Sequence, residues 1–407
     1  MEKPDNYSRD TMNDLVKRYQ STSKKINMKR KRTKQKVVFI LSESFSDPMQ
    51  VPGVKLNRDP IPYTRNLIKN GVGGNMISDG YGGGTANMEY QALTGLSLGN
   101  FSATLPTPYT QLVVRQTKTF SVNNAFSSSL AMHPYAGTLY SREQVFKKMR
   151  FNEFEYLSHR YPKRYTSKIG TNPYVSDRSA YKSLLYALKH NSNSQFVQLS
   201  TMQNHMPFTK KYYKNNQFTA TGKFSSEERS AIETYSKGIN YTDKANQYLL
   251  QKLKKMKENV TVVFYGDHLP SIYDHVDLEK DGVQMHKTPY FIWSNHQKLN
   301  QPKYQKMVGT YSFASEMLQA TDSKVTPYYA LVQKVSERLP IIASKVSTTS
   351  SNPNLPSGGM NLINQTNEQL MTTSELTKQQ KKLLHDYELV QYDFTAGHHY
   401  ALNSLTK

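Results

Sequence analysis

Three short apolar runs, each followed at once by polar residues, constrain the fold of this 407-residue chain most strongly. The runs are KVVFILSES at 36–44, QFVQLSTMQNH at 195–205 and NVTVVFYGDH at 259–268. Apolar runs of this length are typical of buried strands, and residues 228–256 have the spacing of one long amphipathic helix. Strand, helix and strand in this order predict an α/β fold whose central, mostly parallel sheet is flanked by helices.

The polar residues after these runs mark the place where a functional site is expected. In open sheets of this kind, functional groups gather just beyond the carboxyl ends of the strands. Here the three strand ends offer Glu43, His205 and the neighbouring pair Asp267 and His268. These four side chains are therefore the first candidates for a site.

A glycine-rich segment, SDGYGGGTANMEYQALTGLS at 78–97, places three glycines directly before Thr85 and a run with helical spacing. Glycines let the backbone fold tightly around an anion, and a helix N-terminus presents unpaired N–H groups to it. Threonine is also a good residue to cap a helix N-terminus. The segment alone leaves two interpretations of Thr85 open, a helix cap and a nucleophile.

Groups far from this segment bear on that choice. A threonine hydroxyl is a poor nucleophile at neutral pH unless a base or a metal activates it. Glu43, Asp267 and His268, together with the Thr85 oxygen, would make a four-ligand site suited to Mn²⁺, Mg²⁺ or Zn²⁺. Taken singly, each has an ordinary alternative as a helix-start acid, a turn residue or a locally bonded loop histidine. The metal hypothesis depends on all four together.

Two further segments supply groups that could hold a phosphoryl group. HPYAGTLYSR at 133–142 contains His133 and Arg142, and TMQNHMPF at 201–208 contains His205. Arginine binds phosphate oxygens bidentately, and histidine can donate to an oxyanion or protonate a leaving oxygen. Alone, Arg142 could equally form a surface ion pair, and His205 could bond to the backbone.

The charge of the chain favours a polyanionic partner. There are 53 Lys and Arg against 31 Asp and Glu, a formal net charge of +22. Nucleic acid is not expected as a partner, because the sequence has no zinc finger, helix-turn-helix signature or aromatic RNA-binding run. The absence of cysteine excludes disulfides, thiolate metal sites and a cysteine nucleophile.

Composition divides the chain into three predicted parts. Residues 1–33 form an N-terminal basic connector, since 17–36 carry ten Lys or Arg and no acid. That segment is either a solvated linker or a contact with an anionic surface such as a membrane. Residues 34–335 form the catalytic domain. Residues 336–407 form a smaller part, a loose surface excursion after about Pro340 and then a helix and a short strand-like piece that dock back.

At these residues the sequence resembles the lipoteichoic acid synthase and phosphoglycerol transferase family, a branch of the alkaline phosphatase and sulfatase-like superfamily. The resemblance covers roughly 34–335, and the tail YELVQYDFTAGHHY is similar too. It is carried by SESF, GGGTANMEYQALTG, HPYAGTLYSR, NHMPF and YGDH, in the family's order. The resemblance implies a sulfatase-like fold with a smaller C-terminal subdomain.

The resemblance also implies roles for the site residues. Thr85 takes the position of the family's nucleophile, and Glu43, Asp267 and His268 take those of its metal ligands, typically for Mn²⁺. Arg142 and His205 would hold the glycerol phosphate, with His133 as a neighbour. The sequence departs from the family at Tyr140, where the lipoteichoic acid synthases have tryptophan, so the expected glycerol contact differs here.

The implied function is transfer of the phosphatidylglycerol headgroup, through a phosphothreonine intermediate, onto a lipoteichoic acid or wall polysaccharide acceptor. The alternative is a phosphoethanolamine-type transferase or a phosphatase- or sulfatase-like hydrolase of the same superfamily. A two-metal phosphatase would need a second ligand set, for which Asp274 and His275 are candidates. The implied location is the extracellular face of a Gram-positive membrane, or a secreted form, with anchoring helices ahead of this chain.

Overall fold

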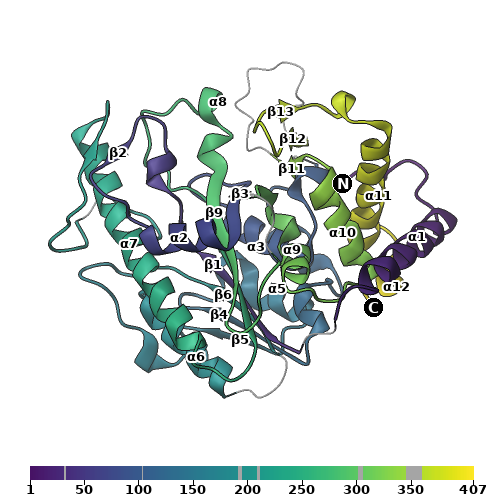
Figure 1. The fold of residues 1–407 in the computed structure, drawn as a ribbon, viewed down its shortest axis with the longest axis horizontal. Helices are drawn as coiled ribbons and strands as arrows, with labels where there is room; N and C mark the ends of the chain where they lie inside the picture. Colours follow the sequence, from purple (N-terminus) through teal and green to yellow (C-terminus); the bar gives the residue numbers. More distant parts are fainter. Residues whose placement is uncertain (32–33, 103, 191–194, 209–210, 301–305, 345–359) are drawn as a thin grey trace.

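The computed structural model of the chain describes residues 1–31, 34–102, 104–190, 195–208, 211–300, 306–344 and 360–407. An eight-stranded sheet with the order β10-β3-β9-β8-β1-β6-β4-β5 runs through the molecule (Figure 1). Its strands are β1 (Lys36–Ser42), β3 (Val72–Ile77), β4 (Ser128–His133), β5 (Glu153–Tyr156), β6 (Gln195–Ser200), β8 (Val260–Gly266), β9 (Lys287–Ser294) and β10 (Val308–Gly309).

The three strands expected from the apolar runs lie side by side at the centre of this sheet. β1 pairs in parallel with β6 on one side and with β8 on the other. Only β9 runs against its neighbours, pairing antiparallel with both β8 and β3. The prediction of a mostly parallel central sheet is confirmed.

Helices cover both faces of the sheet because alternate residues of each strand point to opposite faces. Val37, Phe39 and Leu41 of β1 belong to one apolar core, whereas Val38 and Ile40 belong to the other. The first core is closed by α3 (Thr85–Thr94), α9 (Phe313–Ala320) and α10 (Pro327–Arg338). The second is closed by α2 (Pro62–Asn70), α6 (Asp177–Lys189) and the expected long helix α7 (Ser226–Leu253).

Most of the expected loose excursion after Pro340, residues 345–359, lies outside the described residues. β11 (Ile341–Ala343), β12 (Asn361–Ile363) and β13 (Leu370–Met371) form a small antiparallel sheet. The strand-like piece expected after the C-terminal helix is wrong, because α11 (Lys378–Thr395) is followed by α12 (Leu402–Thr406) and by no strand among the described residues. Leu383, Tyr387, Val390 and Phe394 are all buried along α11, and their three- and four-residue spacing requires a helix.

The N-terminal segment also differs from a solvated linker. Residues 17–27 belong to α1 (Arg9–Asn27), which packs against α10, α11 and α12. Met12, Leu15 and Tyr19 lie on one side of α1 and are buried. The basic side chains of α1 are exposed, although Arg18 reaches across to Asp386 of α11. The division at residues 33 and 335 stays a prediction.

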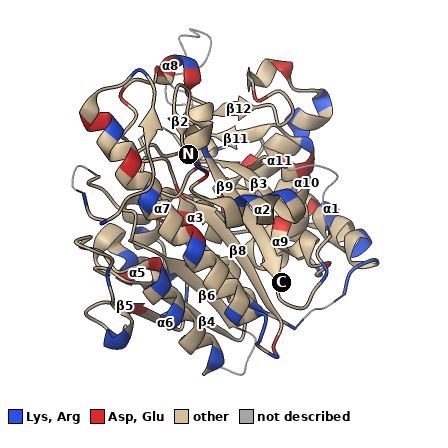
Figure 2. Ribbon diagram, turned by 60° about the vertical axis from the view of Figure 1, so that its left-hand side comes forward, with Lys and Arg blue, Asp and Glu red and all other residues tan. Residues whose placement is uncertain are grey.

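The net positive charge is spread over many elements. Figure 2 shows Lys and Arg on α1, α5 (Arg142–Lys148) and α6, among others. None of the described helices is long and apolar enough to cross a membrane.

Candidate active site

The structure brings four of the predicted site residues together. Glu43 follows β1, Asp267 and His268 follow β8, and Thr85 is the first residue of α3. Ligand atoms of Glu43, Asp267 and His268 all lie within 4.8 Å of one another, and all three side chains are buried. The Thr85 hydroxyl donates to Asp267 Oδ2 at 2.7 Å and lies 3.4 Å from both Glu43 Oε2 and His268 Nε2.

Strand register explains why the two carboxylates meet. Ser42, the last residue of β1, is paired with Gly266, the last residue of β8. The next residues, Glu43 and Asp267, therefore leave the sheet side by side. Asp267 is then fixed through Oδ1, which accepts from the backbone N–H of Ser44 at 2.7 Å and of His268 at 2.9 Å. Oδ2 remains directed at Thr85.

The glycine-rich loop places Thr85 inside the helix rather than at its cap. The cap residue of α3 is Gly84, with φ +90°, a left-handed conformation that glycine adopts without strain. The Thr85 hydroxyl makes no capping bond, so the helix-cap interpretation is wrong. The loop is tied to the Asp267 segment, because Gly82 N–H donates to the Leu269 carbonyl at 2.8 Å and the Ser78 hydroxyl donates to the Asp267 carbonyl.

The electrostatics of the cluster suit a divalent cation. Burial and the neighbouring Glu43 carboxylate raise the pKa of Asp267 to about 6. Burial opposes protonation of His268, but the carboxylates of Asp267 and Glu43 raise its pKa. The His268 Nδ1–H donates to the Leu269 carbonyl at 2.9 Å. In the neutral ring, Nε2 then carries the lone pair that can bind a metal ion, and it faces Thr85. Two carboxylates, an imidazole nitrogen and a hydroxyl oxygen fit Mn²⁺, Mg²⁺ or Zn²⁺.

Arg142 lies in a buried network that the sequence did not predict. Its Nε and one terminal nitrogen donate to the two oxygens of Glu89 at 3.1 and 3.2 Å, and both side chains are buried. Glu89 also accepts from the hydroxyls of Tyr109, at 2.9 Å, and Ser200. Glu89 is one turn after Thr85 on α3, so one helix carries both the candidate nucleophile and the partner of Arg142.

His133 completes this network as a neutral acceptor. At the end of β4, its Nδ1 lies 2.8 Å from the Ser200 carbonyl oxygen and must therefore carry the proton. Nε2 is then free to accept from Arg142, at 3.4 Å. Burial and the Arg142 charge hold the pKa of His133 well below its usual value. His133 therefore contacts Arg142 directly. Its role beside the substrate stays a prediction.

A pocket of about 330 Å³ opens onto the cluster and is lined by Thr85, Glu43, His268, Tyr140 and His205, among others. Arg142 is not part of the lining, because the Tyr140 ring lies over its guanidinium, 5.4 Å away. His205 Nδ1 lies 3.1 Å from the Tyr174 hydroxyl. The pocket thus reaches Tyr140 and His205 directly and Arg142 through Tyr140.

The candidate second metal site does not assemble around His275. Its Nδ1 contacts Glu228, and its Nε2 lies 2.7 Å from the Pro52 carbonyl oxygen, so both ring nitrogens are engaged. Within the described ranges, Glu43, Asp267 and His268 are the one group of three acidic or histidine side chains close enough to hold a metal ion.

The chain matches a known protein family over most of its length. The Sulfatase family model matches residues 35–323. A protein of Rhizobium meliloti (strain 1021), described as modifying cyclic beta-1,2-glucan, is 31% identical over 320 residues, which cover 73% of this chain and 47% of that protein. The chain therefore spans about half the length of that curated relative.

Two solved structures are similar over nearly their whole length. The phosphoglycerol transferase GacH of Streptococcus pyogenes, in complex with sn-glycerol-1-phosphate, is 31% identical with a TM-score of 0.86, covering 100% of this chain and 99% of that one. The lipoteichoic acid synthase LtaP of Listeria monocytogenes is 17% identical with a TM-score of 0.56, covering 94% and 99%, and shares the fold. The predicted family resemblance and the predicted phosphotransferase class are confirmed. The chain belongs to the sulfatase family.

Proposed function

We propose that this protein is a metal-dependent glycerol phosphate transferase that uses Thr85 as its nucleophile. The observation that carries the proposal is the Thr85 hydroxyl, held 2.7 Å from Asp267 within a buried Glu43, Asp267 and His268 cluster at the wall of a pocket. The similarity to GacH, a phosphoglycerol transferase, supports glycerol phosphate as the transferred group.

The metal would be held by Glu43, Asp267, His268 and the Thr85 oxygen. A divalent cation, with Mn²⁺ as the first candidate, would supply Lewis acidity that lowers the pKa of the Thr85 hydroxyl. The fit is chemical, because two carboxylates in a buried space repel each other unless a cation balances them.

In the first step, Thr85 Oγ1 attacks the phosphorus of phosphatidylglycerol or a similar anionic lipid. The bond from phosphorus to the diacylglycerol oxygen breaks, and that oxygen gains a proton in balance with the one that the Thr85 hydroxyl loses. Thr85 then carries the glycerol phosphate as a phosphodiester. In the second step, an acceptor hydroxyl on a teichoic acid or wall polysaccharide attacks the phosphorus, and the Thr85 oxygen is released and reprotonated.

The remaining site residues would stabilise the charge that develops on the phosphoryl oxygens. His205 lines the pocket and can donate to an oxyanion. Arg142 has five N–H groups, of which Glu89 and His133 engage three. A phosphoryl oxygen would reach the other two only with the Tyr140 ring moved aside, because Arg142 does not line the pocket. Tyr140, which lies between the pocket and Arg142, would contact the glycerol.

The proposed setting is the outer face of a Gram-positive cell membrane, with anchoring helices in a longer protein. The basic residues of α1 would then lie near anionic headgroups.

The test is headgroup release from fluorescent phosphatidylglycerol in the presence of Mn²⁺, followed as free diacylglycerol. We expect release that requires both Mn²⁺ and the Thr85 hydroxyl. Phosphatidylethanolamine with the same acyl chains is the matched control. Release from that lipid, but none from phosphatidylglycerol, would overturn glycerol phosphate as the transferred group and favour a phosphoethanolamine-type transferase.

A further inference from the structure

A second hollow lies between helices from the two ends of the chain, apart from the candidate active site. It has a volume of about 450 Å³ and is lined by residues of α1, α10 and α11. Three of its lining residues are cations, Lys334 and Arg338 of α10 and Lys382 of α11. None of the residues that line the active-site pocket lines this one.

The cations of this hollow are poorly balanced by acids. Asp386 is the one acid that lines it, and its carboxylate already accepts from Arg18 at 2.6 and 2.7 Å and from the Tyr19 hydroxyl at 2.8 Å. Lys382 reaches Asp386 only at 3.6 Å. Asp386 is thus largely neutralised by Arg18, which leaves an excess of positive charge over the hollow.

Arg338 and Lys334 share the lack of an ion-pair partner among the described residues. The Arg338 guanidinium also has no hydrogen-bond acceptor in the described ranges, although the chain places it beside Lys334. Burial lowers the pKa of Lys334, and the charges of Arg338 and Lys25 lower it further. The acids Glu337 and Asp386 oppose these effects, yet the pKa of Lys334 is still lowered. A surplus of cations of this kind favours a bound anion.

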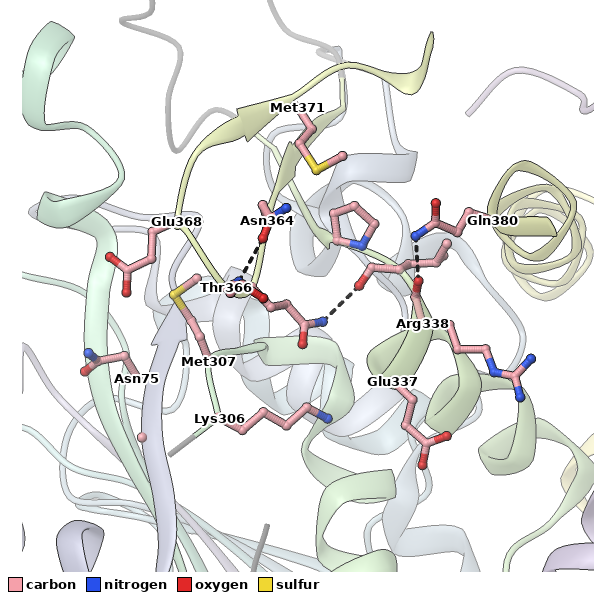
Figure 3. A pocket seen from close by; sticks show the side chains of 14 residues that line it. Asn75, Lys306, Met307, Glu337, Arg338, Asn364, Thr366, Glu368, Met371 and Gln380 are labelled. Carbon is pink, nitrogen blue, oxygen red and sulfur yellow. Dashed lines mark hydrogen bonds between the residues drawn. The ribbon is translucent and has the colours of Figure 1, made fainter. Parts of the chain in front are cut away.

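A larger hollow of about 700 Å³ adjoins this one, and Arg338 and Gln380 line both. Figure 3 shows its wall of amide and hydroxyl side chains, including Asn75, Asn364 and Thr366. Of its charged residues, Lys306 donates to Glu316 at 2.6 Å and Glu368 contacts Lys287. Glu337 and Arg338, which also line it, carry opposite charges. This hollow is therefore polar but close to neutral.

The wall between the two hollows is held rigid by amide groups. The Gln380 side chain donates to the Arg338 carbonyl at 2.9 Å, as Figure 3 shows. The Gln365 side chain donates to the Ser336 and Leu339 carbonyls, both at 2.9 Å. These bonds satisfy the last carbonyls of α10 and fix the backbone that carries Arg338.

We propose that the two hollows form one binding site for a chain of hydroxyl-bearing units that carries phosphate groups. A phosphate would lie among Lys334, Arg338 and Lys382, and an adjoining uncharged polyol or sugar unit would occupy the amide-lined hollow. The site is separate from Thr85, so its occupation can be measured without turnover. It would keep such a polymer on the enzyme between transfer events.

The lining favours a polymer in solution over a membrane surface. Insertion into a bilayer, as distinct from charge attraction to its surface, uses exposed apolar side chains. The large apolar side chains that are exposed in the described ranges are Met28, Met49, Tyr135, Leu157, Tyr186 and Met206. None of them lines either hollow.

The test is calorimetric titration of the full chain carrying Thr85→Ala, so that no probe is consumed. The probes are a defined glycerol phosphate oligomer, inorganic phosphate, an uncharged oligosaccharide and phosphatidylglycerol vesicles. We expect the oligomer to bind more tightly than phosphate or the uncharged sugar. Lys334→Ala with Arg338→Ala should weaken oligomer binding about tenfold or more, because charge-assisted hydrogen bonds are lost.

The matched control removes two positive charges elsewhere, through Lys69→Ala on α2 and Lys182→Ala on α6, both exposed. This control double variant should change the affinity for the oligomer less than twofold. Equal losses in both pairs would overturn the site in favour of general charge attraction. Vesicle binding that depends on Lys334 and Arg338, without oligomer binding, would also overturn it. If the variant with both Lys334→Ala and Arg338→Ala unfolds, the single variant Arg338→Gln, which keeps a long polar side chain, must show weaker oligomer binding by itself.

Discussion

Glu89 and Arg142 form a two-bond ion pair that is almost completely excluded from solvent, with 0% and 1% of their side chains exposed. Their pairing joins α3, which carries Thr85, to the start of α5. Tyr109 and Ser200 also donate to Glu89, and His133 accepts from Arg142. A pair this buried is costly to break, because the partner that is left keeps an uncompensated charge.

Glu89→Gln should lower the free energy of unfolding by about 3–5 kcal/mol, the typical effect of breaking a buried ion pair. It should also lower the rate of transfer, because Arg142 loses the carboxylate that orients it. Denaturant unfolding with parallel activity measurements checks both. Glu279→Gln, at an exposed position of α8 (Leu278–Asp281), is the control and should change neither.

The double variant Glu89→Gln with Arg142→Gln separates charge from shape. With both charges gone, the protein should recover part of the stability lost in Glu89→Gln, while transfer stays low. A double variant less stable than Glu89→Gln would show that the uncompensated Arg142 charge is not the cause.

Asp177, at the start of α6, should make the stability depend on pH. Burial raises its pKa from 3.8 to about 6. A raised carboxyl pKa means that the folded state holds the proton more tightly, so the free energy of unfolding falls as pH rises from about 4 to 6. The whole effect is about 3 kcal/mol at most, from 1.36 kcal/mol for each pKa unit.

Asp177→Asn removes this titration, so it should gain stability relative to the parent protein across that pH range. Unfolding curves at several pH values measure the difference. Asp14→Asn, on an exposed side chain of α1, is the control and should not reproduce this gain in stability. A difference for Asp177→Asn that is constant with pH would contradict the raised pKa.

Removing divalent cations should destabilise the protein as well as stop transfer. A metal that binds only the folded state adds about 2.7 kcal/mol when its free concentration is 100 times its Kd. The melting temperature should therefore fall on chelation and recover with Mn²⁺. Asp267→Asn should respond to neither treatment, whereas Asp274→Asn should respond like the parent protein. An unchanged melting temperature in the parent protein would remove Glu43, Asp267 and His268 as a metal site.

The sequence predicts the part of the site that strand geometry dictates. Glu43 and Asp267 come directly after apolar runs, and parallel register brings such positions together without further information. Glu89 could not be found in this way, because the spacing of Met88, Ala92 and Leu93 indicates only a packed helix. The one available signal was that Glu89, a charged residue, stands within this apolar pattern. Its partner, Arg142, is brought to it by tertiary packing alone.

The ends of the chain show where composition misleads. The basic residues of 17–27 indicated a solvated linker, yet Met12, Leu15 and Tyr19 dock the helix that carries them. For YELVQYDF, local β-propensity competes with a helical spacing of buried residues, and burial of the helical face prevails in α11. In both segments, spacing of the apolar residues was the better guide.

The most direct test of the account is to trap the phosphorylated enzyme. The protein is incubated with phosphatidylglycerol and Mn²⁺ without an acceptor, quenched in acid, and analysed by intact and peptide mass spectrometry. The predicted result is one added glycerol phosphate group on Thr85. The group should be absent in Thr85→Ala and absent when the metal has been removed with a chelator. Modification at another residue, or undiminished diacylglycerol release by Thr85→Ala, would contradict the assignment of Thr85 as the nucleophile.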